Sequence, residues 1–237
     1  MCKIKIKVRC LHCQSPKVVK NGLKSTGKQN LLCKDCGKQF QYEYTYAAAH
    51  PNIRRQIKDS LLHGSGIRDC SSIYKVGHKS VLRLIEREGG SVLIRPLQKQ
   101  YECIELDELY SFVQNKGKKV WIIYAYSRQT GEILAVTMGK RNTQQVRYLM
   151  LKIKHLNIQV NAWRTDKFKG FIKVLRHFNH LIGKQYTKAI EGKNCCIRAR
   201  IARLQRRSTK FSKKLKYQWF LFLIFMKENN LNRASYI

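Results

Sequence analysis

The second half of the chain begins with a pattern that is typical of a β-sheet. Apolar and polar positions alternate over residues 101–107, and two strongly apolar segments follow at 119–126 and 132–138. Gly117 and the segment 128–131 supply turn residues between them. Alternation with a period of two predicts strands, and short connections predict that neighbouring strands pair antiparallel. These positions therefore predict a three-stranded meander.

Helical and extended segments then alternate along the chain. The segment 142–155 places its apolar residues on one face with helical spacing, which predicts a helix. The elements expected next are a strand at 158–163, a helix at 168–178, an extended piece at 182–186 and a long helix from Lys188 to about Arg207. The order βββαβαβα is that of ribonuclease-H-like domains. We therefore predict an α+β protein in which residues 101–237 form a ribonuclease-H-like mixed α/β catalytic domain.

Three short helices are expected before the sheet, in residues 49–90. A helix begins at Pro51, a second spans 67–74, and a third spans 79–88 after a turn that contains Gly77. Two short helices joined by a glycine-bearing turn are typical of the helix-turn-helix motif, although three helices that only pack together would give the same pattern. As the DNA-reading motif, the third helix would enter the major groove, with candidate contacts His78, Lys79, Ser80 and Arg83. Gly89, Gly90 and Pro96 indicate a linker at about 91–100.

Two CxxC pairs near the N-terminus predict a zinc ribbon in residues 1–48. The pairs are separated by 19 residues, and their cysteines are Cys10, Cys13, Cys33 and Cys36. Residues 3–8 alternate lysine with apolar residues, which favours a strand over an export signal, so we expect a reducing compartment and metal binding rather than disulfides. Four thiolates complete a tetrahedral Zn²⁺ site with no open position, so the expected role of this zinc is structural.

The charge of the chain indicates a polyanionic partner. Its 48 Lys+Arg residues against 14 Asp+Glu give a formal net charge of +34 over 237 residues. Such a charge, spread along a chain with an ordinary apolar content, favours nucleic acid as the partner. No apolar segment is long enough to span a bilayer, so we expect no membrane partner. The predicted location is the cytoplasm, with the protein associated with the nucleoid.

Isolated carboxylates in this basic sequence are candidate metal ligands. Residues 140–216 contain 22 basic side chains, whereas Asp166 and Glu191 are the only acidic residues between positions 133 and 227. Asp107 is expected at the end of the first strand, Asp166 at the end of the fourth, and Glu191 in the first turn of the last helix. Hard carboxylate oxygens at one edge of the sheet suit Mg²⁺ or Mn²⁺. Salt-bridge partners are the plainer alternative, and Glu105 and Glu108 are rivals for Asp107's role.

Several segments resemble the insertion-sequence-one family of DDE transposases. They are the two CxxC pairs, ELDELYSFV, Thr165-Asp166, GKQYTKAIEGKN and ARLQRRSTKFSK, which together span nearly the whole chain. The resemblance implies a transposase that binds the ends of its element and catalyses metal-dependent DNA strand cleavage and strand transfer. It maps the catalytic carboxylates to Asp107, Asp166 and Glu191, with 24 residues between the last two.

The same resemblance implies double-stranded DNA as partner, both element ends and target, and a homo-oligomer on that DNA. Arg200 and Arg203 in the basic tail pattern are the expected additional DNA contacts. The chain departs from the family's usual pattern at Lys167-Phe168, at Gly192 and in the segment after Lys214. A non-catalytic DNA-binding repressor of its own element, an inactive remnant and a ribonuclease-H-type nuclease are the alternative functions.

Overall fold

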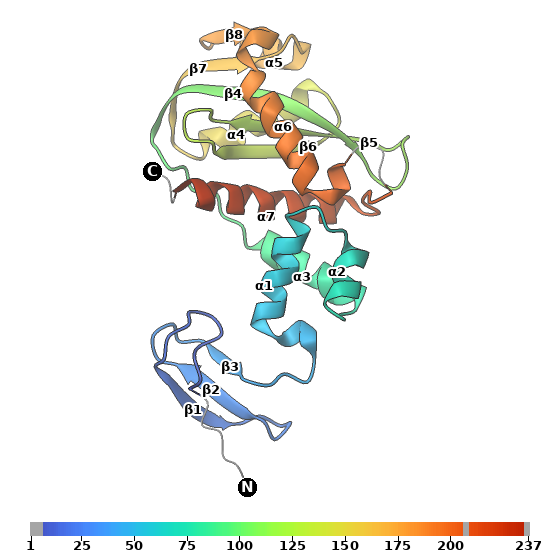
Figure 1. Ribbon diagram of the computed structural model, residues 1–237. Helices are drawn as coiled ribbons and strands as arrows, with labels where there is room; N and C mark the ends of the chain where they lie inside the picture. The colour runs from blue at the N-terminus through green and yellow to red at the C-terminus, as the bar shows by residue number, and fades with distance from the viewer. Residues whose placement is uncertain (1–6, 206–208, 235–237) are drawn as a thin grey trace. The chain divides into compact units, whose positions relative to one another are not determined.

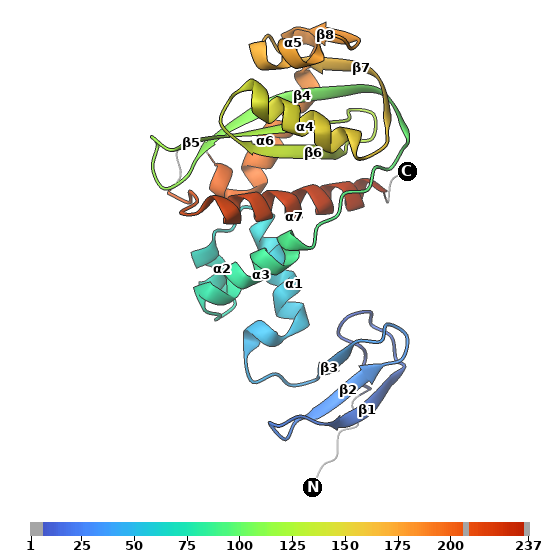
Figure 2. The same cartoon turned by 180° about the vertical axis from the view of Figure 1, so that it is seen from behind.

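The computed structural model describes residues 7–205 and 209–234. The chain divides into two compact units, one formed by residues 1–60 and 67–81, the other by residues 61–66 and 82–237. Figures 1 and 2 show their elements from opposite sides. Residues 3–6 of the predicted N-terminal strand lie outside the described part of the chain.

The first unit begins with a small antiparallel sheet. Its strands are β1 (Val18–Leu23), β2 (Gln29–Cys33) and β3 (Gln39–Gln41), in the order β1-β2-β3. The buried core beneath this sheet is small and consists of Cys10, Leu31, Cys33 and Phe40. So few buried apolar side chains cannot offset the cost of ordering the chain, which is why domains of this size usually need a metal or a disulfide. The sheet therefore depends on its cysteines.

Three helices follow, as the sequence predicts: α1 (Pro51–Leu61), α2 (Ile67–Ile73) and α3 (His78–Gly90), after a 3₁₀ turn at Ala47–Ala49. Helix α3 is two residues longer at its C-terminal end than the predicted helix 79–88, because it continues through Gly89 and Gly90. Gly89 lies against Phe220, and a Cβ at position 89 would stand only 2.4 Å from the Phe220 Cβ. This glycine is therefore a packing residue and not a chain breaker.

The second unit is built on a five-stranded mixed sheet. Its strands are β4 (Gln100–Phe112), β5 (Lys119–Tyr126), β6 (Ile133–Gly139), β7 (Gln159–Thr165) and β8 (His180–Ile182), in the order β6-β5-β4-β7-β8. The pairs β4–β5 and β5–β6 are antiparallel, which confirms the meander. The pairs β4–β7 and β7–β8 are parallel. This is the ribonuclease-H-like order, so the predicted fold class is confirmed.

Helices cover both faces of this sheet: α4 (Thr143–Lys154), α5 (Lys169–Leu175) and α6 (Lys188–Arg200). Figures 1 and 2 show α4 and α5 on one face and α6 on the other. The core under α4 contains Ile104, Leu106 and Ile123. The predicted extended piece at 182–186 is only partly correct, because β8 ends at Ile182 and a 3₁₀ turn follows at Lys184–Tyr186. Helix α6 ends at Arg200, short of the predicted end at Arg207, which lies outside the described residues.

The tail forms one more helix, α7 (Leu215–Ala234), which the sequence reading did not predict. Its buried residues include Leu221, Phe222 and Phe225. The Asn230 amide accepts from the Ile133 backbone N–H and donates to the Ile133 carbonyl, both at 2.9 Å. Asn230 thus satisfies backbone groups of β6, which is an edge strand of the sheet. Within the described ranges, no helix is both long and apolar enough to cross a membrane.

Candidate metal centres

The four cysteines of the two CxxC pairs come together in the first unit. One sulfur from each of Cys10, Cys13, Cys33 and Cys36 lies within 4.8 Å of the others. The tight turns that present them are closed by bonds from the Gln14 N–H to the Cys10 carbonyl and from the Gly37 N–H to the Cys33 carbonyl. Gln14 and Gly37 both have positive φ, at 61° and 67°. The sequence spacing is therefore sufficient to converge all four sulfurs.

The four sulfurs differ in their surroundings. The pKa of the Cys13 thiol is lowered by a backbone hydrogen bond at Ser15, but desolvation and hydrogen bonds with the other three cysteines outweigh this effect and raise it to about 12. Backbone N–H donation, first from Cys36 and also from Asp35, lowers the pKa of the Cys33 thiol to about 7. The His12 N–H donates to the Cys10 sulfur at 3.4 Å. Thiolates with backbone donors around them are what Zn²⁺ binds in closed four-cysteine sites. The donor set fits zinc.

Asp107 does not end its strand, contrary to the sequence prediction. Strand β4 continues to Phe112, and Asp107 pairs with Tyr124 of β5. The parallel partner β7, however, ends where Thr165 pairs with Leu106. Asp107 therefore lies one position beyond the end of the β4–β7 ladder, and Asp166 is the first residue after β7. The two aspartates meet because one strand stops while its neighbour continues.

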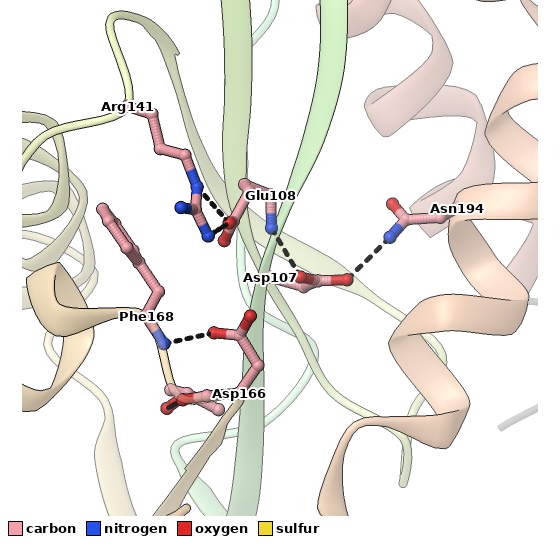
Figure 3. A network of polar contacts seen from close by, with 7 residues as sticks. Asp107, Glu108, Arg141, Asp166, Phe168 and Asn194 are labelled. Carbon is pink, nitrogen blue, oxygen red and sulfur yellow. Dashed lines mark hydrogen bonds and ion pairs between the residues drawn. The ribbon is translucent and has the colours of Figure 1, made fainter. Parts of the chain in front are cut away.

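Three carboxylates gather at this position. Asp107, Glu108 and Asp166 each contribute an oxygen, and these oxygens lie within 4.8 Å of one another. Figure 3 shows the three side chains and their polar contacts. The Phe168 N–H donates to the Asp166 Oδ1 at 2.9 Å, and the Glu108 N–H donates to the Asp107 Oδ1 at 2.8 Å. Backbone donors thus orient both aspartates.

Asp107 is linked to α6 and to the core of the sheet. The Asn194 amide donates to the Asp107 Oδ2 at 2.8 Å, and the hydroxyl of fully buried Tyr124 donates to the Asn194 Oδ1 at 2.9 Å. The Tyr124 bond fixes which end of the amide faces Asp107. The sequence analysis included Asn194 only as part of the family-like segment GKQYTKAIEGKN and gave it no role. Its position three residues after Glu191, one helical turn away, is the feature that could have identified it.

Burial and neighbouring negative charges raise the pKa values of Asp107 and Glu108. The pKa of Asp107 is raised to about 7, first by burial and then by Glu108 and Asp166, against the lowering effect of its two hydrogen bonds. The pKa of Glu108 is also raised, first by burial and then by Asp166. Acids that resist ionisation in the metal-free protein gain most from a bound cation. Hard oxygen ligands in this arrangement fit Mg²⁺ or Mn²⁺.

Glu191 lies apart from the three clustered carboxylates. It is exposed in the first turn of α6, where Thr187 Oγ1 donates to its Oε1 at 3.5 Å. Its helix is nevertheless attached to the site, because Asn194 contacts Asp107 one turn later. The buried carboxylate of Glu105 also accepts from the Ile190 N–H at 2.9 Å, which ties the start of α6 to β4. The Glu105 carboxylate therefore holds the start of α6 and is not one of the clustered carboxylates.

The predicted DNA contacts differ in their exposure. His78, Lys79 and Arg83 are exposed on α3, and Ser80 is partly buried. Arg200 is exposed at the end of α6. Arg203 is partly buried, and its Nη1 donates to the Ser212 hydroxyl, so this side chain has an intramolecular partner. Of the two tail arginines, Arg200 is the one that a phosphate could reach directly.

The second unit matches a known family. A family model described as IS1 transposase matches residues 101–227. The chain belongs to the IS1 transposase family. As a transposase it is an enzyme that cuts DNA. The match continues through Lys227, so the expectation that the sequence departs from the family's ending after Lys214 is wrong up to that residue.

Relatives from bacterial insertion elements agree with this assignment. The InsB protein of element iso-IS1n from Shigella dysenteriae is 37% identical over 109 residues, which cover 46% of this chain and 82% of that protein. The InsB protein of element IS1 9 from Escherichia coli strain K12 is 30% identical over 145 residues, 61% of this chain and 80% of that protein. Among solved structures, the HTLV-2 integrase catalytic core in complex with magnesium aligns with a TM-score of 0.33 at 15% identity, over 43% of this chain and 68% of that chain.

Proposed function

We propose that this transposase is of the DDE type, with Asp107, Asp166 and Glu191 as its catalytic carboxylates and Mg²⁺ or Mn²⁺ as its cofactor. The observation that carries the proposal is the convergence of Asp107 and Asp166 at the end of the β4–β7 ladder. The reaction is cleavage at the element ends by water, followed by attack of the freed 3′-hydroxyl on target DNA. Bound divalent ions supply the Lewis-acid charge that activates the attacking oxygen and stabilises the leaving oxygen.

The chain's own groups hold and orient this chemistry. The Phe168 N–H holds one oxygen of Asp166, whereas the Glu108 N–H and the Asn194 amide hold the two oxygens of Asp107, so both carboxylates have a defined direction. Glu191 stands one helical turn before Asn194, on the same side of α6. A rotamer change at Glu191 that gives up its long bond to Thr187 would turn its carboxylate toward the two aspartates. In this proposal Glu191 joins the site when metal and DNA are bound.

We assign DNA reading to the ribbon and to the three helices α1, α2 and α3 that follow it. The exposed side chains at the start of α3 (His78, Lys79 and Arg83), together with Ser80, are in the position that a recognition helix presents to the major groove. The zinc ribbon would support binding of the element ends, and Arg200 would contact phosphates in the second unit. Binding in this form depends steeply on salt, since each neutralised phosphate releases counterions. A homo-oligomer would bring the two ends of the element together.

The decisive experiment separates binding from chemistry. Asp166→Asn and Glu191→Gln should each reduce strand cleavage and strand transfer by roughly 10⁴-fold or more, because these side chains act as a unit with the metal. Binding to element-end DNA should remain, since neither change removes positive charge. Gel-shift and strand-transfer assays on the same preparations measure the two properties. Glu102→Gln, an exposed glutamate of β4, is the matched control and should behave as wild type.

A non-catalytic repressor is the alternative that this experiment addresses. Such a protein would need only the DNA-reading residues, and nothing in that role accounts for three clustered carboxylates in a basic protein. Substantial cleavage by the Asp166→Asn protein would place the active site elsewhere. Absence of any cleavage by the wild-type protein, with intact binding of end DNA, would favour the repressor.

A further inference from the structure

The starting observation is an unpaired oxygen on Glu108. The Glu108 side chain is only 5% exposed. Its Oε1 accepts from Arg141, whereas its Oε2 is buried and has no hydrogen-bond partner among residues 7–205 and 209–234. A buried carboxylate oxygen without a partner is unfavourable, and native structures usually supply a donor or a cation. One oxygen of Glu108 also lies within 4.8 Å of oxygens of Asp107 and Asp166.

The second observation concerns how Glu108 is held. The Arg141 guanidinium lies 4.1 Å from the centre of the Phe168 ring and 5.2 Å from the centre of the Trp121 ring. The backbone N–H of the same Phe168 donates to Asp166. Glu108 and Asp166 are therefore connected through Arg141 and Phe168, as Figure 3 shows. The aromatic contacts fix the planar cation, which in turn fixes Glu108.

We propose that Glu108 is a direct ligand of the first divalent ion, together with Asp107 and Asp166, and that Arg141 is the positioning residue that holds it. The proposal rests on the proposed metal-dependent function and extends it to a fourth carboxylate. Arg141 keeps one oxygen of Glu108 and leaves the other for the metal. A ligand held by a second partner in this way is typical of metal sites in proteins.

In this proposal the carboxylates are divided between two ions according to their positions. Asp107, Glu108 and Asp166 are already gathered in the metal-free fold, whereas Glu191 lies outside their cluster. The first ion should therefore bind to these three carboxylates before DNA is present and without Glu191. Glu191 then supplies the ligand for the second ion. Phe168, one of the positions that depart from the family pattern, has a role in this arrangement through its contacts with Arg141 and Asp166.

The test is a titration of the DNA-free, zinc-loaded full chain with Mn²⁺. The electron paramagnetic resonance signal of free Mn²⁺ measures how much of the ion is bound. Glu108→Gln keeps an acceptor for Arg141 but removes the charge, and it should weaken binding of the first ion at least about tenfold. Asp166→Asn should do the same. Glu191→Gln should leave the first ion in place, and Glu102→Gln should match wild type. Circular dichroism establishes that each variant is folded.

The outcomes distinguish this inference from the proposed function. If Asp166→Asn loses the ion and Glu108→Gln binds it as wild type does, Glu108 is not a ligand and the proposed function stands. If neither change weakens binding, the metal site lies elsewhere and both proposals fail. Loss of the first ion in Glu191→Gln would also overturn the division of ligands. Should Glu108→Gln not fold, Glu108→Asp retains the charge beside Arg141 but shortens the side chain, and it should weaken binding in the same assay.

Discussion

The four-cysteine ribbon and the carboxylate site can be compared directly, because both bring candidate metal ligands together from separate segments but by different means. Each CxxC pair presents two sulfurs from one turn, and β2 connects the second pair to the sheet. The carboxylates come from the middle of β4 and from the end of β7, and their partners come from α6 and from Arg141 before α4. The ribbon's ligand set is local, whereas the carboxylate set depends on the assembled sheet.

The two sites also differ in what remains unsatisfied without metal. Backbone N–H groups surround the ribbon's sulfurs and lower the pKa of Cys33. In the second unit, burial and like charges raise the pKa of Asp107 to about 7, and one Glu108 oxygen has no hydrogen-bond partner in the part of the chain that the structure describes. A metal held by four protein ligands has no free coordination position, so such a site is structural. A carboxylate site whose oxygens are only partly hydrogen-bonded can bind an ion that still has positions for water or substrate. We therefore expect the two sites to respond differently to ligand substitution, metal removal and pH.

The largest expected effect is on the ribbon. Cys33→Ser, or removal of zinc by a chelator, should unfold residues 7–45, because binding of structural zinc supplies about 10–16 kcal/mol of folding free energy in small domains. Limited proteolysis should show new cleavage within this segment, and binding of end DNA should be lost. Mn²⁺ binding by the carboxylate site should not change. The control is Cys195→Ser, which changes an exposed cysteine outside the cluster. A ribbon that resists proteolysis without zinc would contradict the structural role proposed for the metal.

A smaller effect is expected at Asn194, which supports the carboxylate site from α6. Asn194→Leu removes the donor to Asp107 and the acceptor for Tyr124 at similar volume, and it should reduce metal affinity and strand cleavage by about 10–100-fold. Metal titrations of the cleavage rate should show that high Mn²⁺ restores part of the activity. A merely structural role would lower activity without any change in metal dependence, and that result would remove Asn194 from the positioning network.

The smallest expected effect is on pH dependence. A carboxyl group whose folded pKa is raised destabilises the metal-free fold as pH rises from its unfolded value near 4 through its folded value of about 7 for Asp107. The metal-free protein should therefore lose stability over this window. Binding of Mg²⁺ displaces the proton, so the rise in melting temperature on adding Mg²⁺ should grow with pH and level off above about pH 8. Thermal melts with and without Mg²⁺ measure both quantities.

The control for this pH effect is Asp107→Asn, in which the metal-free protein should show a weaker decrease in stability over the same window. Glu108, whose pKa is also raised, accounts for the part that remains. A Mg²⁺-induced shift in melting temperature that is independent of pH would contradict the electrostatic description of the site. That result would not bear on the ribbon, because the ribbon's cysteines are not part of the carboxylate site.

Sequence patterns predicted most of the fold in the second unit. The meander, the helix α4 and the strand β7 followed by Asp166 depend on periodicity within single segments. They appear within about two residues of the predicted bounds, except that β4 continues five residues beyond its predicted end at Asp107. The errors concern positions where distant segments meet. Gly89 reads as a helix breaker, but close packing against Phe220 keeps it inside α3. The sequence analysis predicted no element after Lys214, where α7 forms with buried apolar residues and with Asn230 bonded to the edge strand β6.

The sequence by itself determined the four-cysteine cluster, since the spacing within and between two short turns leaves the sulfurs one way to converge. It also singled out Asp166 and Glu191, because isolated carboxylates in so basic a segment stand out, whereas Asp107 had Glu105 and Glu108 as rivals. Only the tertiary structure decided that Asp107 lies within a strand, beside the point where β7 stops, and that Glu108 joins the two aspartates while Glu191 stands outside them. Pairing register and packing between segments far apart in the chain set these positions, and no local pattern encodes them.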